Sequence, residues 1–328
     1  MAGTKYLEGF IPYSRELIRE YTETRAWENL TYGDILDRAA SQYPDNIAVV
    51  DDRNRLTYRE LKDQVDRFAI ALLQLGLKSH DRVIIQLPNR FEFVVAFYGL
   101  QKMGAVPVLA IPRHGRQEIS TFFKVTDAVG WIVPARDGKI AFAPLIDAIR
   151  SEYRKLRHII MPEDGDALPS YALSLEKLIE DVIPENYEAN YLEQFRPDPN
   201  DVAVLIPTGG TTGLPKMVPR SHNSLIVTNK YISKDLEPSD SLIQATPVGH
   251  AMAMQGAVNC AVYKGATLVL QGILRPTEIM ETIQREKVTR VFLVPPQLEG
   301  VINHPDLKKY DFSSLKIVGT TGAALPRE

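Results

Sequence analysis

The chain has 328 residues, of which 45% are hydrophobic and 24% charged, and its formal net charge is −3 at pH 7. A typical domain has roughly 150 residues, so this length predicts two domains or one domain with two lobes. The composition excludes wholesale disorder, collagen-like repeats and coiled-coil rods. There is no basic excess to favour a nucleic-acid partner. The single cysteine, Cys260, excludes an internal disulfide framework and a multi-cysteine zinc site.

No targeting or membrane segment is visible in the sequence. The N-terminal residues contain no uninterrupted apolar stretch of signal-peptide length, and no run approaches the roughly 20 apolar residues of a membrane span. A single cysteine also needs no oxidising compartment. We therefore expect a cytoplasmic protein that has neither a membrane nor a nucleic acid among its partners.

In the first half of the chain, apolar runs of strand length alternate with segments of helical period. A hairpin is expected at 47–58, followed by a helix at 59–77 whose apolar residues recur at helical spacing. Asn89 is expected to cap the helix that begins at Phe91, and Gly104 to follow its C-terminus. The other expected strands are 82–87, 105–111, 130–133 and 156–161, and the other helices are 91–103, 118–128 and 143–154.

The second half begins with an interruption of this rhythm. Residues 162–200 are rich in acids, prolines and asparagines, and we expect surface loops there around a helix at 173–181. The alternation then resumes, with strands at 202–206, 241–245, 266–270, 290–294 and 315–319, and helices at 224–233, 277–286 and 297–302. Such repetition predicts an α/β fold with mostly parallel sheet, covered by helices on both faces.

The sharpest chemical signal is the segment IPTGGTTGLPK, which follows a buried strand. Its glycines allow positive φ and let backbone N–H groups approach a ligand, while its threonines add hydroxyls and its lysine a positive charge. The spacing is neither that of a Walker A loop nor that of GxGxxG. It predicts a cradle for a polyphosphate; the alternative is an ordinary loop between two strands. The candidate residues are Thr208, Gly209, Gly210, Thr211, Thr212, Gly213 and Lys216.

The segment TGGTTGLPK resembles the phosphate-loop signature of the adenylate-forming enzymes, which include acyl-CoA synthetases, luciferases and peptide-synthetase adenylation domains. The PRSH that follows, residues 219–222, resembles an extension found in the aryl-acid branch, typified by 2,3-dihydroxybenzoate–AMP ligase. Residues 10–36, 81–119 (which contain QLPN) and 318–325 (VGTTGAAL) resemble further segments of that branch. The resemblance therefore runs in order along essentially the whole chain.

The resemblance implies an activity. Enzymes of this kind bind Mg-ATP and a carboxylic acid, form an acyl-adenylate with release of pyrophosphate, and pass the acyl group to the thiol of a carrier protein or of coenzyme A. It implies ATP and Mg²⁺ as cofactors, an aromatic acid as substrate, and catalytic roles for Lys216 and His250. Arg220 and His222 would support the nucleotide loop; alternatively, Ser221 only caps a helix and the two basic residues are solvated.

The resemblance also points to an acid-binding segment, TPVGHAMAMQG. It places His250 between the carboxylate and the phosphate, the alternative being a capping or structural histidine. Ala251 stands where the branch has an asparagine that bonds the ring hydroxyl, and Met252 where it has tyrosine, so 2,3-dihydroxybenzoate itself is not favoured. Alanine has no hydrogen-bonding side chain. Met252 and Met254 would line an apolar, adaptable pocket unless they only fill the core.

The end of the chain matches a family segment that lies against adenine. By resemblance Gly322 and Ala323 are the small residues of the adenine and aryl pocket; alternatively they only form a turn before a helix. Ala324 departs from the family pattern, which often has lysine there. The family's later motifs, including a catalytic lysine, would follow Glu328. We therefore expect the front part of a longer protein that is inactive in adenylation alone, a natural short form being the alternative.

The resemblance implies two doubly wound αβ sublobes of the large N-terminal domain, with the C-terminal barrel and lid lobe absent. The expected sublobes are 1–80 plus 239–328 on the acid-binding side, and 81–238 with the phosphate loop near its end. The ligand cleft is expected between them, at the carboxyl ends of strands. The alternatives are a ligase that uses free coenzyme A and a non-catalytic, truncated binding protein. A nicotinamide dehydrogenase is disfavoured, because no GxGxxG follows an early strand.

Overall fold

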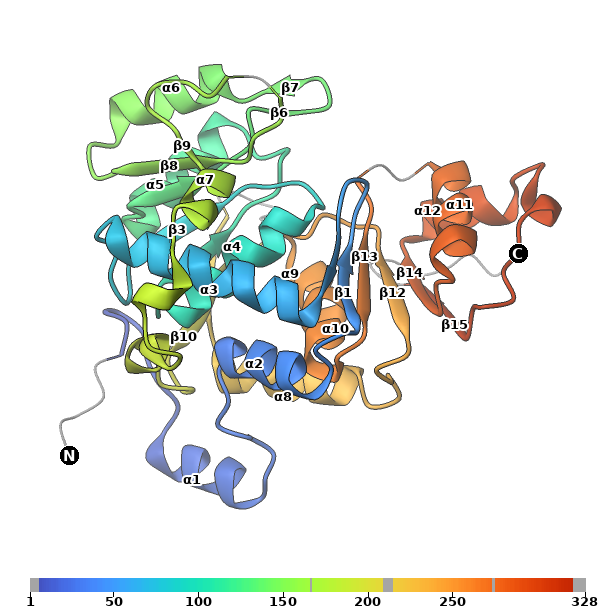
Figure 1. Cartoon of the computed structure of the whole chain (residues 1–328), viewed down its shortest axis with the longest axis horizontal. Coiled ribbons are helices and arrows are strands. Elements are labelled where there is room, and N and C mark those ends of the chain that lie inside the picture. Colours follow the sequence, from blue (N-terminus) through green and yellow to red (C-terminus); the bar gives the residue numbers. More distant parts are fainter. Residues whose placement is uncertain (1–5, 166, 209–214, 273–274, 321–328) are drawn as a thin grey trace.

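Two β-sheets form the frame of the molecule, and helices lie between them and on their outer faces (Figure 1). The computed structural model describes residues 6–165, 167–208, 215–272 and 275–320. Strand pairing is parallel throughout both sheets except for one antiparallel pair at an edge of each. The parallel α/β architecture predicted from the alternation of strands and helices is confirmed.

The six-stranded sheet combines an early hairpin with strands from the last third of the chain. Its parallel strands are long apolar runs such as Thr267–Leu270, as expected for a sheet that is buried on both faces. Its strands in spatial order are β15 (Ile317–Thr320), β14 (Arg290–Leu293), β12 (Ser241–Gln244), β13 (Thr267–Leu270), β1 (Ile47–Val50) and β2 (Arg55–Thr57).

The seven-stranded sheet is built from residues 82–221. Its strands in spatial order are β11 (Met217–Ser221), β10 (Val202–Pro207), β4 (Val106–Leu109), β3 (Arg82–Ile85), β5 (Gly130–Ile132), β8 (His158–Met161) and β9 (Leu173–Ser174). A separate small hairpin consists of β6 (Arg136–Asp137) and β7 (Ile140–Ala141). The strand order does not test the predicted sublobe boundaries at residues 80 and 238, which stay a prediction.

A layer of helices fills the space between the two sheets and shares one hydrophobic core with both (Figure 1). Every residue of α4 is buried, because its sequence FEFVVAFYGLQK is apolar around most of its circumference. Gly99 allows α3 to pack closely on α4, since a Cβ there would lie 2.7 Å from Cδ1 of Phe68. The helices of this layer are α2 (Tyr32–Gln42), α3 (Tyr58–Gln74), α4 (Phe91–Lys102), α8 (His222–Ile232) and α10 (Asn259–Lys264).

Helices also cover the outer face of each sheet, which gives five layers in all. On the seven-stranded sheet these are α5 (Arg116–Thr126) and α6 (Ala143–Glu152), and on the six-stranded sheet α11 (Pro276–Glu286) and α12 (Pro295–Ile302). The remaining helices are α1 (Arg15–Glu23), α7 (Leu175–Glu180) and α9 (Ala251–Ala253). Short 3₁₀ turns occupy Pro184–Asn186, Tyr191–Phe195 and Leu307–Lys309, and a π-helical turn occupies Met254–Val258.

The start of α4 differs from the sequence prediction. Its N-cap residue is Arg90 rather than Asn89, and Arg90 makes no side-chain cap hydrogen bond. The first free N–H group of the helix, that of Phe91, donates instead to Oδ2 of Asp51 at 2.9 Å. The prediction that Asn89 caps this helix is therefore wrong, because its side chain is engaged elsewhere. Gly104 does follow the helix end as predicted, with a φ of +74°.

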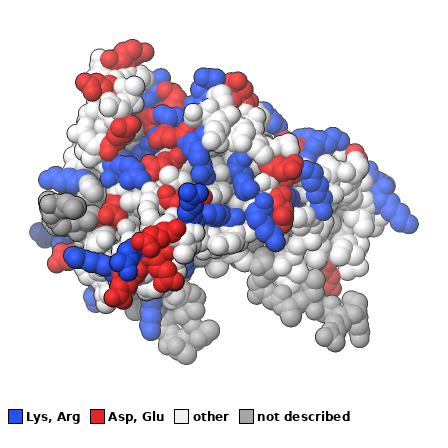
Figure 2. Space-filling model, turned by 90° about the horizontal axis from the view of Figure 1, so that it is seen from below, with Lys and Arg blue, Asp and Glu red and all other residues white. Residues whose placement is uncertain are grey.

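The surface carries charges of both signs. On the face shown in Figure 2, lysine and arginine side chains are interspersed with aspartate and glutamate. Several of these charges are paired along one helix, as in Lys62–Asp66 and Arg67–Asp63 of α3. Among the described residues, no helix is both long enough and apolar enough to cross a membrane.

The close contact between α3 and α4 predicts that Gly99→Ala destabilises the protein. Alanine favours a helix by about 1 kcal/mol over glycine, but the added methyl group would overlap the buried ring of Phe68. Gly256→Ala is the matched control, since no atom lies within 4 Å of a Cβ at that position. Urea unfolding should show Gly99→Ala to be less stable than Gly256→Ala by about 1–3 kcal/mol, the usual cost of overpacking. Equal stabilities would contradict this packing.

Candidate active site

The candidate residues lie where the carboxyl ends of the parallel strands of both sheets meet. Thr208 directly follows β10, and the segment 245–250 directly follows β12. In open α/β sheets, this edge is where ligands bind, because the loops that leave the strands there can converge on one point. The structure thus brings one candidate segment from each sheet to the same edge.

Thr208 and Lys216 close the base of the glycine-rich loop. The N–H of Thr208 donates to the carbonyl of Lys216 at 2.9 Å, and the N–H of Lys216 donates to Oγ1 of Thr208 at 3.2 Å. These bonds extend the antiparallel ladder that ends with Pro207 opposite Met217. The loop therefore joins two strands. This connectivity is expected both for a polyphosphate cradle and for an ordinary loop. Gly209, Gly210, Thr211, Thr212 and Gly213 lie outside the described residues.

Gly249 lets the His250 segment pack against the seven-stranded sheet. A Cβ on Gly249 would lie 2.1 Å from the carbonyl oxygen of Ala110, just beyond β4, so only glycine fits there. β4 pairs with β10 in a register that sets Leu205 beside Val108. Thr208 therefore follows β10 at the same edge where Ala110 follows β4. The bases of the two candidate segments are therefore neighbours.

His250 presents one ring nitrogen to its own helix and leaves the other for a ligand. The side chain is exposed, and Nδ1 accepts a hydrogen bond from the N–H of Met252 at 3.4 Å, which caps α9. A neutral imidazole whose Nδ1 accepts carries its proton on Nε2. The capping interpretation is thus confirmed, and it leaves an Nε2–H donor. Burial holds the pKa of His114 below its usual value, and the nearby His250 acts in the same direction.

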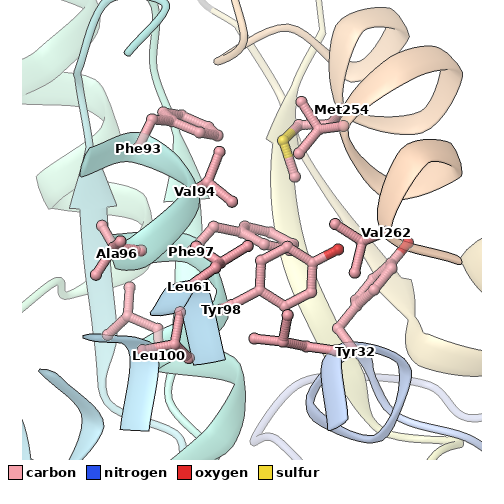
Figure 3. Close-up of a cluster of buried hydrophobic side chains, with 14 of the residues drawn as sticks. Tyr32, Leu61, Phe93, Val94, Ala96, Phe97, Tyr98, Leu100, Met254 and Val262 are labelled. Carbon is pink, nitrogen blue, oxygen red and sulfur yellow. The ribbon is translucent and has the colours of Figure 1, made fainter. Parts of the chain in front are cut away.

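The two methionines of this segment have different surroundings. Met254 is 1% exposed, and Figure 3 shows its side chain pointing into the buried cluster that contains Phe93 and Val94 of α4. The prediction that Met254 lines a pocket is therefore wrong, since it fills the core. Ala251 and Met252 are half-buried at the start of α9. They are the residues of the segment that can still face a bound acid.

A π-helical turn follows directly and is held by a buried polar network. The carbonyl of Gln255 accepts hydrogen bonds from Nδ2 of Asn229 at 2.8 Å and from Sγ of Cys260 at 3.0 Å. The hydroxyl of Tyr32 donates to Oδ1 of Asn229 at 3.1 Å. π turns leave carbonyl groups without their usual helical partner and occur often at functional sites. No pattern in the sequence predicted this turn.

Three buried side-chain oxygens at this edge have no hydrogen-bond partner among the residues that the structure describes. They are Oε1 of Gln86 after β3, Oε1 of Gln271 after β13 and Oγ1 of Thr320 at the end of β15. Buried polar groups are normally satisfied by protein, water or a ligand. Their position at the strand ends therefore supports a polar ligand here, a signal that the sequence analysis did not use. Gly322 and Ala323, two and three residues beyond Thr320, lie outside the described residues.

Most of the chain, residues 36–328, matches the family model described as AMP-binding enzyme. The chain belongs to this family. It is 32% identical over 326 residues to the 2,3-dihydroxybenzoate-AMP ligase of Bacillus subtilis, a match that covers 98% of this chain and 58% of that protein. It is also 32% identical over 332 residues to the salicyl-AMP ligase / salicyl-S-ArCP synthetase of Mycobacterium tuberculosis, covering 98% and 57%.

Solved structures agree with this membership of the AMP-binding enzymes. The apo structure of MbtA from Mycobacterium smegmatis has a TM-score of 0.85 at 30% identity, and the match covers 98% of this chain and 57% of that one. The anthranilate CoA ligase AuaEII in complex with anthranoyl-AMP has a TM-score of 0.82 at 25% identity, covering 91% and 56%. The predicted adenylate-forming fold is confirmed, and this chain spans just over half the length of these relatives.

The PRSH segment of this AMP-binding enzyme lies away from the phosphate loop. Ser221 caps α8, accepting from the N–H of Ser224 at 3.3 Å, as one interpretation predicted. His222 is not solvated: it is 1% exposed, and its Nδ1 accepts from the N–H of Tyr32 at 3.3 Å. Burial lowers the pKa of His222 to about 3. Because Ser221 pairs with Val202 at the beginning of β10, His222 sits at the opposite end of that strand from Thr208.

The buried neutral His222 predicts a loss of stability in mild acid. Its pKa is about 3 in the folded protein and near 6.5 in an unfolded chain. Between these values only the unfolded state binds the proton, so stability falls by up to about 1.4 kcal/mol per pH unit as the pH decreases. His222→Asn keeps an acceptor for Tyr32 but cannot titrate. Urea unfolding from pH 6.5 to 4.5 should therefore show a shallower decline for His222→Asn; identical slopes would contradict a neutral histidine.

The burial of Cys260 predicts that its thiol is unreactive in the folded protein. Burial raises its pKa to about 12, so the reactive thiolate is nearly absent at pH 8. The aromatic disulfide reagent DTNB releases its coloured thiolate when it reacts with a protein thiol. We expect almost no release with the native protein and one equivalent per chain in urea, since the chain has one cysteine. Cys260→Ser is the blank. Rapid stoichiometric reaction of the native protein would show that Cys260 is accessible.

Proposed function

We propose that this protein activates an aromatic carboxylic acid with ATP, forming an aryl-adenylate and releasing pyrophosphate. One observation carries the proposal: the glycine-rich loop, closed at its base by Thr208 and Lys216, leaves β10 at the edge where Gly249 of the His250 segment packs against Ala110, the residue that follows the neighbouring strand β4. A phosphate-binding loop and a hydrogen-bond donor for an acid are what this reaction needs side by side. The aryl-acid ligases among the relatives support this choice of substrate.

The reaction divides the work between the two segments. A carboxylate oxygen of the acid attacks the α-phosphorus of ATP, the bond from that phosphorus to the β-phosphate bridging oxygen breaks, and pyrophosphate leaves with its electron pair. Phosphoryl chemistry of this kind depends mainly on positioning and charge neutralisation. In this proposal, the loop 208–216 holds the departing phosphates, with Lys216 supplying positive charge. His250 donates from Nε2–H to an oxygen of the acid or of the α-phosphate.

Mg²⁺ belongs to the proposal as a companion of ATP. Within the described parts of the chain, no group of three or more His, Cys, Asp or Glu side chains could hold a metal ion. Mg²⁺ commonly binds through substrate phosphates and waters with only one or two carboxylates, so a protein cage is not required. When bound with the triphosphate, it would neutralise charge on the leaving group. Among the described residues of this segment, Thr208 would offer it a hydroxyl oxygen.

The acid-binding wall would be formed by Ala251 and Met252, with Gly322 and Ala323 on the adenine side. Alanine offers no hydrogen bond to a ring hydroxyl, so we expect the pocket to accept aromatic acids that lack an ortho-hydroxyl as readily as those that carry one. We propose that the thiol of a carrier protein accepts the acyl group. Coenzyme A is the second candidate, because one similar structure is an anthranilate CoA ligase. Cytoplasmic location remains part of the prediction.

Pyrophosphate–ATP exchange tests the proposal in the full-length protein. Benzoate, salicylate, anthranilate and 2,3-dihydroxybenzoate should be compared, and at least one should support exchange. Lys216→Ala and His250→Ala should each lower kcat about 100-fold, as expected for loss of a group that stabilises transition-state charge. Lys155→Ala is the matched control, since Lys155 pairs with Asp127 before β8, at the opposite edge of the sheet.

Two results would contradict the proposal. One is the absence of exchange with any aryl acid, and the other is full activity of Lys216→Ala. Because this chain spans only 57–58% of the two aryl-acid ligases, we expect the 328 residues alone to show no appreciable exchange. Supplying the successful acid with coenzyme A or with a carrier protein then distinguishes the two acceptors.

A further inference from the structure

Asn89 joins the two sheets at the edge that carries the candidate site. It lies in the QLPN segment that follows β3 of the seven-stranded sheet. Its Nδ2 donates to the carbonyls of Gln244 at 3.3 Å, Thr246 at 2.9 Å and Gln271 at 3.0 Å, all in the six-stranded sheet or its loops. Its Oδ1 accepts from the N–H of Val248 at 2.8 Å. One side chain thus contacts four backbone groups of the other sheet, with the two N–H groups of its amide shared among three carbonyls.

The backbone around Asn89 is itself held firmly. The next residue, Arg90, is buried, and its Nη2 lies 2.6 Å from Oε1 of Glu92 and 2.9 Å from Oδ1 of Asp164. One residue further on, the N–H of Phe91 is bonded to Asp51. Asn89 therefore projects its amide from a fixed point. Its hydrogen bonds can hold the loop after β12 in one position.

The bonded groups lie immediately before His250. Thr246 and Val248 precede it by four and two residues, and the N–H of His250 itself closes a turn onto the carbonyl of Pro247 at 3.0 Å. We propose that Asn89 is a positioning residue that sets the position and orientation of His250 relative to the phosphate loop. This inference rests on the proposed function, since it assigns His250 a role in acid activation. Without the amide, the loop loses its bonds to the seven-stranded sheet and keeps the Gly249 contact with Ala110 and the bonds from Nε2 of Gln244 to Thr246.

Two substitutions separate the donors from the acceptor. Asn89→Ala removes both, whereas Asn89→Asp keeps an acceptor for Val248 and sets a carboxylate oxygen against three carbonyl oxygens. Asn223→Ala is the matched control. Asn223 is also buried and also ties distant segments, through Nδ2 bonds of 3.0 Å to Oδ1 of Asn29 and of Asn200, but at the amino end of β10. It distinguishes general destabilisation from a local effect.

The first readout is amide hydrogen exchange of residues 245–252 in the full-length protein. Both Asn89 variants should exchange there about tenfold faster than the wild type, because Asn89→Ala loses the acceptor for the N–H of Val248 and Asn89→Asp repels the carbonyl groups that the amide had bonded. Asn223→Ala should leave this segment protected at the wild-type level. Wild-type protection in both Asn89 variants, or equal exposure in Asn223→Ala, would overturn the proposal.

The second readout is pyrophosphate exchange with a saturating acid. Both Asn89 variants should lower kcat about tenfold with little change in the KM for ATP, because a misplaced His250 affects the reacting geometry rather than phosphate binding. Asn89→Asp should be at least as damaging as Asn89→Ala; wild-type kcat in Asn89→Asp would overturn the role of the donors. If the wild type shows no exchange with any acid, the proposed function fails, and amide exchange still decides whether Asn89 holds the loop.

Discussion

The structure depends on one constraint: α4 is buried on every side. A helix with no solvent face needs apolar partners all around it, and the two sheets with α2, α3 and α10 supply them. Its polar residues bond to neighbouring elements, as where Nε2 of Gln101 donates to the carbonyl of Ala203 in β10 of the seven-stranded sheet at 2.7 Å. The buried Lys102 forms ion pairs with Asp37 and Asp66. Because both sheets help to enclose α4, both are held against the same layer of helices.

The candidate site follows from that enclosure. Because both sheets are tied to the same helices, the loops leaving their carboxyl ends come close enough for direct contacts. Asn89 and Gly249 make those contacts from opposite sides, one through hydrogen bonds and the other by lacking a side chain. The hairpin base at Thr208 follows β10 at the same edge. Neither sheet alone carries both Thr208 and His250, so the proposed chemistry would require the pair.

The sequence predicted the parallel strands well, because buried strands are continuous apolar runs that few other structures resemble. It missed β11, whose Pro219 and Arg220 look unlike a strand; proline is tolerated there because β11 is an edge strand. It also missed α2, although the Thr31–Asp34 capping box before an apolar stripe was a usable signal. The cap assigned to Asn89 failed for a different reason: its partners are about 155 to 182 residues away, and no local pattern reveals them.

Gly249 and the two residues that follow His250 differ in how much change they can accept. No side chain fits at Gly249, and the loop before it is fixed by Asn89. Ala251 and Met252 are half-buried at the first turn of a short helix, outside that fixed part. Natural variation and directed evolution can therefore diversify the recognition surface at these two positions without disturbing the frame. Evolvability in this segment is therefore greatest at two residues beside a glycine that no other residue can replace.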